Sequence, residues 1–181
     1  MAKITIGNTL MILCSLFYLL WWTIAFKPGT AAGGKMTALL LLGAFLSGVA
    51  GIAVTCTGIQ SANANAARSL YPPFALLIGG AAAYFLLLVL TRVLFKRQVT
   101  TELILIVGWA VLELSVVNTF YGSGKNAPGI SVFESALIIL AAILSLVCYV
   151  LYYRLPARAG WIDGMLPLVL AGVVMTVVTI I

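Results

Sequence analysis

Long apolar runs alternate with short polar segments along the whole chain. A membrane-spanning helix needs about 20 mostly apolar residues to cross a hydrocarbon core of about 30 Å. The runs show no alternation with a period of two, which argues against the strands of a membrane barrel. Six runs are long enough, and they predict helices over residues 8–26, 35–58, 73–95, 100–121, 131–153 and 163–181.

Turn and cap residues set the expected ends of these helices. Residues 27–29, Lys-Pro-Gly, end the first run because proline and glycine both break helices. Pro73 is expected in the first turn of the third helix, where a missing N–H costs nothing. Asp163 is the expected N-cap of the last helix, with Pro167 close enough to its start to be tolerated.

The sequence therefore predicts an all-α integral membrane protein with one transmembrane domain over residues 1–181, a six-helix bundle with short loops. Residues 9–13 align weakly with residues 101–105, so a 3+3 inverted repeat and two unrelated halves both stay open. Gly43, Ser47 and Gly51 recur every four residues, and small residues also fill the start of the third run. Such patterns let helix backbones approach closely, which predicts a tight hairpin of the second and third helices.

Composition excludes several classes of protein. Of the 181 residues, 64% are apolar and 8% are charged, whereas soluble domains have about 45–50% and about 25%. A soluble enzyme, a nucleic-acid binder and a disordered protein are therefore excluded, and the lipid bilayer is the expected partner. Histidine is absent, which removes most zinc sites and histidine-activated nucleophiles. The three cysteines match no metal or redox spacing, so we expect no metal and no cofactor.

The basic residues predict the orientation of the helices. The net charge is +6, and the basic residues stand between the apolar runs. Seven of them fall in the first, third and fifth loops and three on the opposite side, and cytoplasmic loops carry the excess of Lys and Arg. We expect a plasma-membrane protein with those three loops in the cytoplasm and both termini outside. The seven are Lys27, Lys35, Arg92, Lys96, Arg97, Arg154 and Arg158, and the three are Lys3, Arg68 and Lys125.

One acidic residue falls in the middle of a span. Glu113 lies about twelve residues into the fourth helix, with Trp109 one turn earlier on the same face. An ionisable group at that depth costs about 2.5–3.5 kcal/mol or more, unless it is paired, protonated or wetted. Glu113 is therefore either a ligand-binding or proton-carrying carboxylate, or a protonated side chain bonded to a neighbouring helix.

A second acidic residue, Glu134, lies in the first turn of the fifth helix, where the helix dipole alone favours a carboxylate. Because a short loop joins the fourth and fifth helices, they must be antiparallel neighbours, and Glu134 faces the same region as the outer half of the fourth helix. We therefore predict a ligand-binding pocket that opens to the outside. Its residues are Trp109, Glu113, Asn118, Tyr121, Lys125 and Glu134.

Three functions compete at this point. The first is the binding or transport of a small molecule or ion, which suits short loops and a lone carboxylate beside a tryptophan. The second is a structural or accessory subunit, with no ligand of its own, that packs against a partner membrane subunit or a second copy. The third is an enzyme, which we do not expect because no nucleophile–base pair or acidic cluster is apparent.

Overall fold

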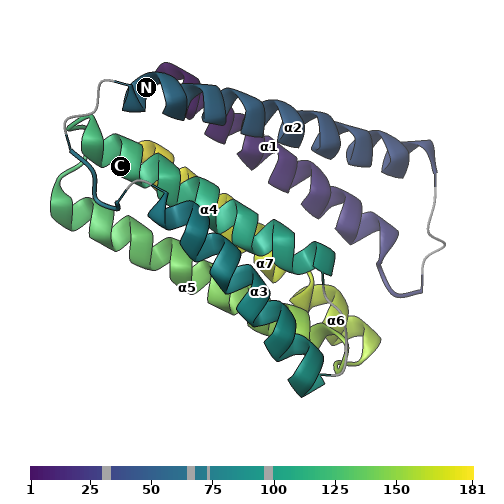
Figure 1. Ribbon diagram of the computed structural model, residues 1–181. Coiled ribbons are helices and arrows are strands. Elements are labelled where there is room, and N and C mark those ends of the chain that lie inside the picture. Colours follow the sequence, from purple (N-terminus) through teal and green to yellow (C-terminus); the bar gives the residue numbers. More distant parts are fainter. Residues whose placement is uncertain (30–33, 65–67, 73, 96–99) are drawn as a thin grey trace.

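The computed structural model describes residues 1–29, 34–64, 68–72, 74–95 and 100–181, and in these residues it contains helices and no strand. Six stretches are long and apolar enough to cross a membrane, the last of them divided into two helices. The predicted all-helical architecture with six membrane-length stretches is confirmed. Figure 1 shows a bundle with both termini at one end, called here the terminal end. The helices are α1 (Ala2–Ala25), α2 (Lys35–Asn63), α3 (Ala75–Phe95), α4 (Thr100–Gly122), α5 (Pro128–Tyr152), α6 (Ala157–Asp163) and α7 (Leu166–Ile180).

Several helices extend beyond their apolar runs. The first begins at Ala2 and not at residue 8, α2 continues to Asn63, and α5 begins at Pro128. The backbone stays helical at the polar ends of α1 and α2, where hydropathy no longer predicts a membrane-spanning helix, and Pro128 fits the first turn of α5. The expected helix start at Pro73 and the basic residues 96 and 97 lie outside the described residues.

The last span is interrupted, and the expected N-cap at Asp163 is wrong. Asp163 is the final residue of α6, and Met165 is the N-cap of α7. In a continuous helix the carbonyl of Asp163 would accept from the N–H of residue 167, but Pro167 has none. The break therefore falls one turn before the proline, and the span begins earlier than expected, at Ala157.

An aromatic side chain from α1 fills the bend between α6 and α7. The indole N–H of Trp22 donates to the carbonyl of Trp161 at 3.1 Å. A Cβ at Gly164 would overlap the Trp22 ring, so only glycine fits there. About two helical turns further into the bundle, the Ser15 hydroxyl donates to the carbonyl of Leu168 at 2.7 Å. These contacts attach α1 to the interrupted span.

The closest helix pair is α1 with α2, so the expected hairpin of the second and third helices is wrong. A Cβ at Gly51 would lie 3.0 Å from the carbonyl oxygen of Gly7, and a Cβ at Gly58 would lie 3.0 Å from the backbone nitrogen of Ile4. These glycines remove the side chains that would hold the two backbones apart. The small residues of α2 were recognised in the sequence, but their partner is the preceding helix.

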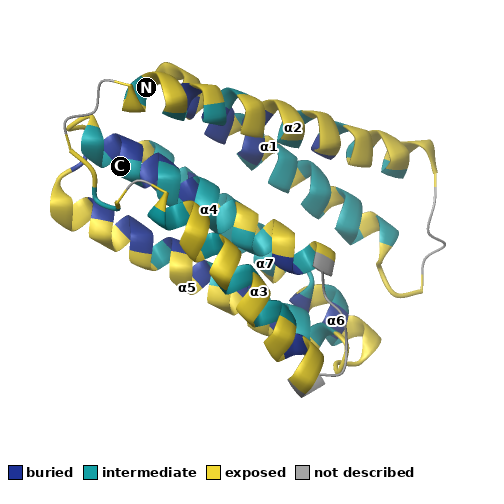
Figure 2. Cartoon of the chain, in the orientation of Figure 1, coloured by how far each residue is buried: buried dark blue, intermediate teal, exposed yellow. Residues whose placement is uncertain are grey.

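The buried core joins α1, α4, α5 and α7. Phe120 is its largest fully buried side chain, and Ile4, Ile138 and Val178 belong to the same apolar cluster. Figure 2 shows buried residues concentrated in this part of the bundle, while α2 and α3 are mostly exposed. In α3 the main helix contact is with α4. The core therefore surrounds the inner face of α4, which carries Glu113.

Candidate functional site

Glu113 lies inside the bundle, fully buried in the core face of α4. Nine residues separate it from the end of α4 at Gly122, which is about 14 Å of helix. Its Oε2 accepts from the amide Nδ2 of Asn8 in α1 at 3.4 Å. Its Oε1 has no hydrogen-bond partner among the described residues. Half of a carboxyl group is therefore unpaired inside the bundle, where the burial of an unpaired polar atom is costly.

Asn8 connects this carboxyl group to a third helix. The same Nδ2 lies 3.3 Å from the hydroxyl oxygen of Thr179 in α7, and that hydroxyl donates to the carbonyl of Met175. Asn8 is itself fully buried, and its Oδ1 has no partner in the described part of the chain. A polar contact thus joins α1, α4 and α7 through one asparagine.

Glu134 is held in a similar way near the turn between α4 and α5. It is fully buried, and its Oε2 accepts from Nδ2 of Asn126 at 2.8 Å. The turn aims Asn126 inward, because Gly124 adopts a left-handed φ of 77° and the Asn126 N–H donates to the carbonyl of Phe120. Among the described residues, Glu134 Oε1, Asn126 Oδ1 and the Ser131 hydroxyl lack partners.

The structure therefore contains two Asn–Glu units, Asn8–Glu113 and Asn126–Glu134. In each unit one amide N–H donates to one carboxyl oxygen, and the other carboxyl oxygen and the amide oxygen are unpartnered in the described residues. Both lie in the halves of α4 and α5 nearer the terminal end, because Glu134 is six residues from the start of α5, about 9 Å. Packing of α4 against α5 brings the two units into one region of the bundle.

The other predicted site residues have varied surroundings. Trp109 packs against the core, half-buried, with its indole N–H unpartnered within the described residues. Tyr121 is half-buried at the end of α4. Lys125 is exposed, and its ammonium group lies 4.0 Å from the centre of the Phe120 ring and 3.4 Å from the carbonyl of Thr179. Lys125 therefore stands at the rim of the terminal end.

Asn118 holds a loop. Its Oδ1 accepts from the backbone N–H groups of Leu70 at 2.8 Å and Tyr71 at 3.1 Å, and from the hydroxyl of Ser69 at 3.2 Å. One amide oxygen therefore fixes the segment that precedes α3 onto α4. This contact gives Asn118 a structural task that its position in the sequence did not reveal.

Three polar partners were not predicted as site residues. Asn8 is the first residue of the first predicted helix, and Asn126 and Thr179 are not among the six predicted site residues. The sequence does contain a signal for Asn8. A polar amide within an apolar helix needs a hydrogen-bond partner, as a glutamate there does. The pairing of Asn8 with Glu113 joins positions 105 apart and depends on tertiary packing.

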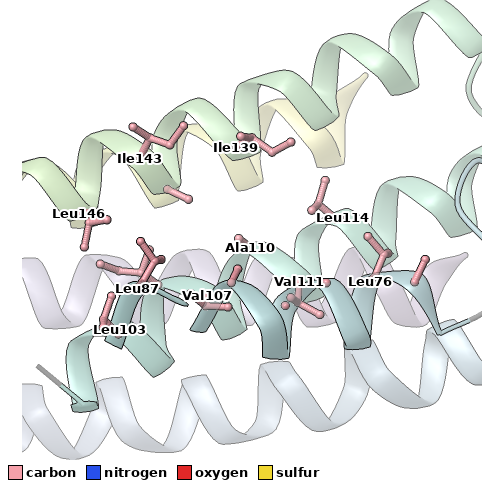
Figure 3. A pocket seen from close by; sticks show the side chains of 16 residues that line it. Leu76, Leu87, Leu103, Val107, Ala110, Val111, Leu114, Ile139, Ile143 and Leu146 are labelled. Atoms are coloured by element: carbon pink, nitrogen blue, oxygen red, sulfur yellow. The ribbon is translucent and has the colours of Figure 1, made fainter. Parts of the chain in front are cut away.

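A cavity of about 320 Å³ lies elsewhere, between α3, α4 and α5. Its described lining residues are apolar side chains and glycines, and none of the six predicted site residues is among them. Figure 3 shows the lining side chains of α5 facing those of α3 and α4 across it. Searched over the described residues, the chain brings no three His, Cys, Asp or Glu side chains together in a metal-binding group. No family model, no curated protein and no solved structure matches the chain.

Proposed function

We propose that the chain is an integral membrane protein that binds or transports a small polar solute through the region of the two Asn–Glu units. The observation that carries this proposal is the fully buried Glu113, whose Oε1 lacks a partner among the described residues. An ionisable side chain inside a membrane span is costly and is typical of solute pathways and proton relays. The length and apolar character of the six stretches support insertion into a bilayer.

The unpartnered atoms favour a solute with positive charge. Four of them are oxygens, two from amide groups and two from carboxyl groups. An amide oxygen can only accept a hydrogen bond, and the same holds for a carboxyl oxygen when the group is ionised. A small cation or a protonated amine satisfies such atoms. The long 3.4 Å contact between Asn8 and Glu113 is a weak bond that such a solute replaces at little cost.

Ligand-dependent thermal stability of the purified protein tests this function. We expect a small inorganic or organic cation to raise the melting temperature of the wild-type protein, and Glu113→Gln to abolish that rise. Glu102→Gln is the matched control, because Glu102 lies in the first turn of the same helix and is half-buried. An undiminished rise in Glu113→Gln, or no rise with any member of a panel of cations, amines, amino acids and vitamins, contradicts the proposal.

The basic residues support the proposed orientation in the plasma membrane, with both termini outside. Five of the described basic residues stand near the end of the bundle opposite the termini, and three stand near the terminal end. The five are Lys27, Lys35, Arg92, Arg154 and Arg158. The alignment of residues 9–13 with residues 101–105 is the observation behind the 3+3 inverted repeat, and two unrelated halves remain its alternative.

An accessory subunit is the second candidate, and the exposure of α3 favours it. Phe85, Leu86 and Val93 on this apolar helix are each at least 60% exposed, and its main contact is with α4. A partner membrane subunit or a second copy that packs there would use van der Waals contacts between helices. Co-purification of a stoichiometric partner, together with no response to solutes, favours this candidate over the first.

A further inference from the structure

The apolar cavity between α3, α4 and α5 is a crevice that opens to the surface. Ile139 and Ile143 line it and are 49% and 54% exposed. Their exposed surfaces belong to the outer face of α5, which bilayer lipids cover in a membrane-inserted protein. The crevice in Figure 3 therefore connects directly to the hydrocarbon that surrounds the bundle.

Small residues on α3 create the crevice. A Cβ at Gly80 would overlap a methyl group of Val111, so this glycine lets α3 lie close against α4. Gly79 and Ala83 also line the crevice, and a Cβ at Gly79 would meet no atom within 4 Å. As a result, α3 lies close against α4, and no side chain fills the space between α3 and α5.

The dimensions of the crevice match one hydrocarbon chain. Its lining residues in α3 run from Ala75 to Leu87, and those in α4 run from Leu103 to Leu114. These stretches are about 18 Å and about 17 Å long. A cavity of about 150 Å³ accommodates benzene, with its six carbon atoms, so a volume of about 320 Å³ has room for about a dozen carbon atoms in a row.

The length leaves room for about 13 methylene groups, because a zigzag of bonds of about 1.5 Å advances about 1.3 Å per carbon. The lining offers such a chain no polar side chain among the described residues. An empty crevice would deprive its lining atoms of contacts on one side. A polar solute or ordered water has nothing to bond there.

A cationic side chain stands beyond one end of the crevice. Arg92 is exposed in the last turn of α3, five residues after Leu87 and therefore about 7–8 Å further along the helix. An acyl chain that leaves the crevice at this end brings its ester and phosphate groups to the level of Arg92. Basic residues at such positions attract anionic headgroups.

We propose that this crevice binds one acyl chain of a bilayer phospholipid whose phosphate group lies beside Arg92. The chain fills the space between α3 and α5 and supplies contacts that the side chains of these helices do not make. This site is separate from the two Asn–Glu units, and the proposal does not depend on the proposed solute.

Native mass spectrometry of the full-length protein, in detergent micelles with added phosphatidylglycerol, tests the proposal. The wild-type protein is expected to keep one phospholipid after the detergent is removed. In Ala83→Trp the indole occupies the crevice, and the lipid-bound fraction should fall at least tenfold. Ala82→Trp is the matched control, since Ala82 is exposed on the same helix and does not line the crevice. Equal retention by Ala83→Trp and the wild-type protein overturns the proposal.

A second variant covers the case in which Ala83→Trp does not fold. Gly79→Leu places a side chain in the crevice from a position where a Cβ meets nothing, so it should fold and still lose the lipid. Arg92→Ala should lower retention of phosphatidylglycerol severalfold and that of phosphatidylcholine less, because the choline cation already offsets the charge of its phosphate group. Full retention in Gly79→Leu overturns the acyl-chain site, and an unchanged preference in Arg92→Ala overturns the headgroup position.

Discussion

At the scale of single residues, asparagine is the side chain that organises the interior. Asn8 and Asn126 each give a buried glutamate one N–H donor. An amide is neutral, so it orients the carboxyl group without balancing its charge. The glutamates were predictable from the sequence because a charge within an apolar run is conspicuous. Their pairing with Asn8 and Asn126 was not predictable, because the sequence does not show which helix faces which.

Replacing Asn8 by Ala removes its contacts with Glu113 and Thr179 at 3.4 Å and 3.3 Å. Hydrogen bonds between membrane helices contribute about 0.6 kcal/mol on average and up to about 1.7 kcal/mol. We expect the free energy of unfolding in detergent–SDS mixtures to fall by about 1–2 kcal/mol. Thr9→Ala is the control, because Thr9 is exposed and bonds within its own helix. Equal losses in both variants would contradict this role for Asn8.

Asn118 allows a test with a conservative replacement. Asn118→Ala removes the acceptor for Leu70 and Tyr71, so their amide hydrogens should exchange at least tenfold faster in hydrogen-exchange mass spectrometry. Asn118→Asp keeps an acceptor oxygen and should restore most of the protection. Fast exchange in the aspartate variant as well would show that the amide oxygen is not what holds the loop.

At the scale of the elements, the glycines of α1 and α2 decide which helices pair. The repeat of small residues in α2 correctly indicated a close approach, but Gly7 in α1 supplies the matching surface. The close approach depends on glycines of α1 and α2 that lie opposite each other. The sequence of one helix alone does not show which helix provides the matching surface. The break between α6 and α7 was predictable from Gly164 and Pro167. A proline has no N–H to donate to the carbonyl of the residue four positions earlier, which is Asp163.

Gly7→Ala tests this helix pair. The added Cβ would overlap the hydroxyl of Thr55 and lie 2.7 Å from its backbone nitrogen, so α1 must move away from α2. Overpacking of this kind costs about 1–3 kcal/mol, measured as the free energy of unfolding. Gly79→Ala is the matched control, since its Cβ meets no atom within 4 Å and alanine is the better helix former. A destabilisation as large in Gly79→Ala would contradict the steric explanation.

At the scale of the whole molecule, hydropathy was sufficient to predict the helical class and the six stretches that are long and apolar enough to cross a membrane. It could not predict their arrangement, because lipid-facing and protein-facing surfaces are both apolar in a membrane bundle. The apolar crevice beside α3 was missed for the same reason. The predicted orientation depends on charge alone and needs its own experiment.

Cysteine labelling in intact cells tests this orientation. With Cys14, Cys56 and Cys148 replaced by alanine, Ser123→Cys should react with a membrane-impermeant maleimide from outside. Leu155→Cys should react only after the cells are permeabilised. Both positions are exposed, and they lie at opposite ends of α5. The reverse pattern would place the terminal end in the cytoplasm.

The contact between Asn8 and Thr179 joins positions 171 residues apart, and this separation bears on how the bundle is assembled. During synthesis α1 emerges first and meets α2 at once, whereas α7 emerges after all the other helices. Until α7 arrives, the Asn8 amide lacks one of the two acceptors that it has in the folded bundle. Arrival of the last helix therefore completes a bond with the first, and this bond distinguishes a finished bundle from an unfinished one.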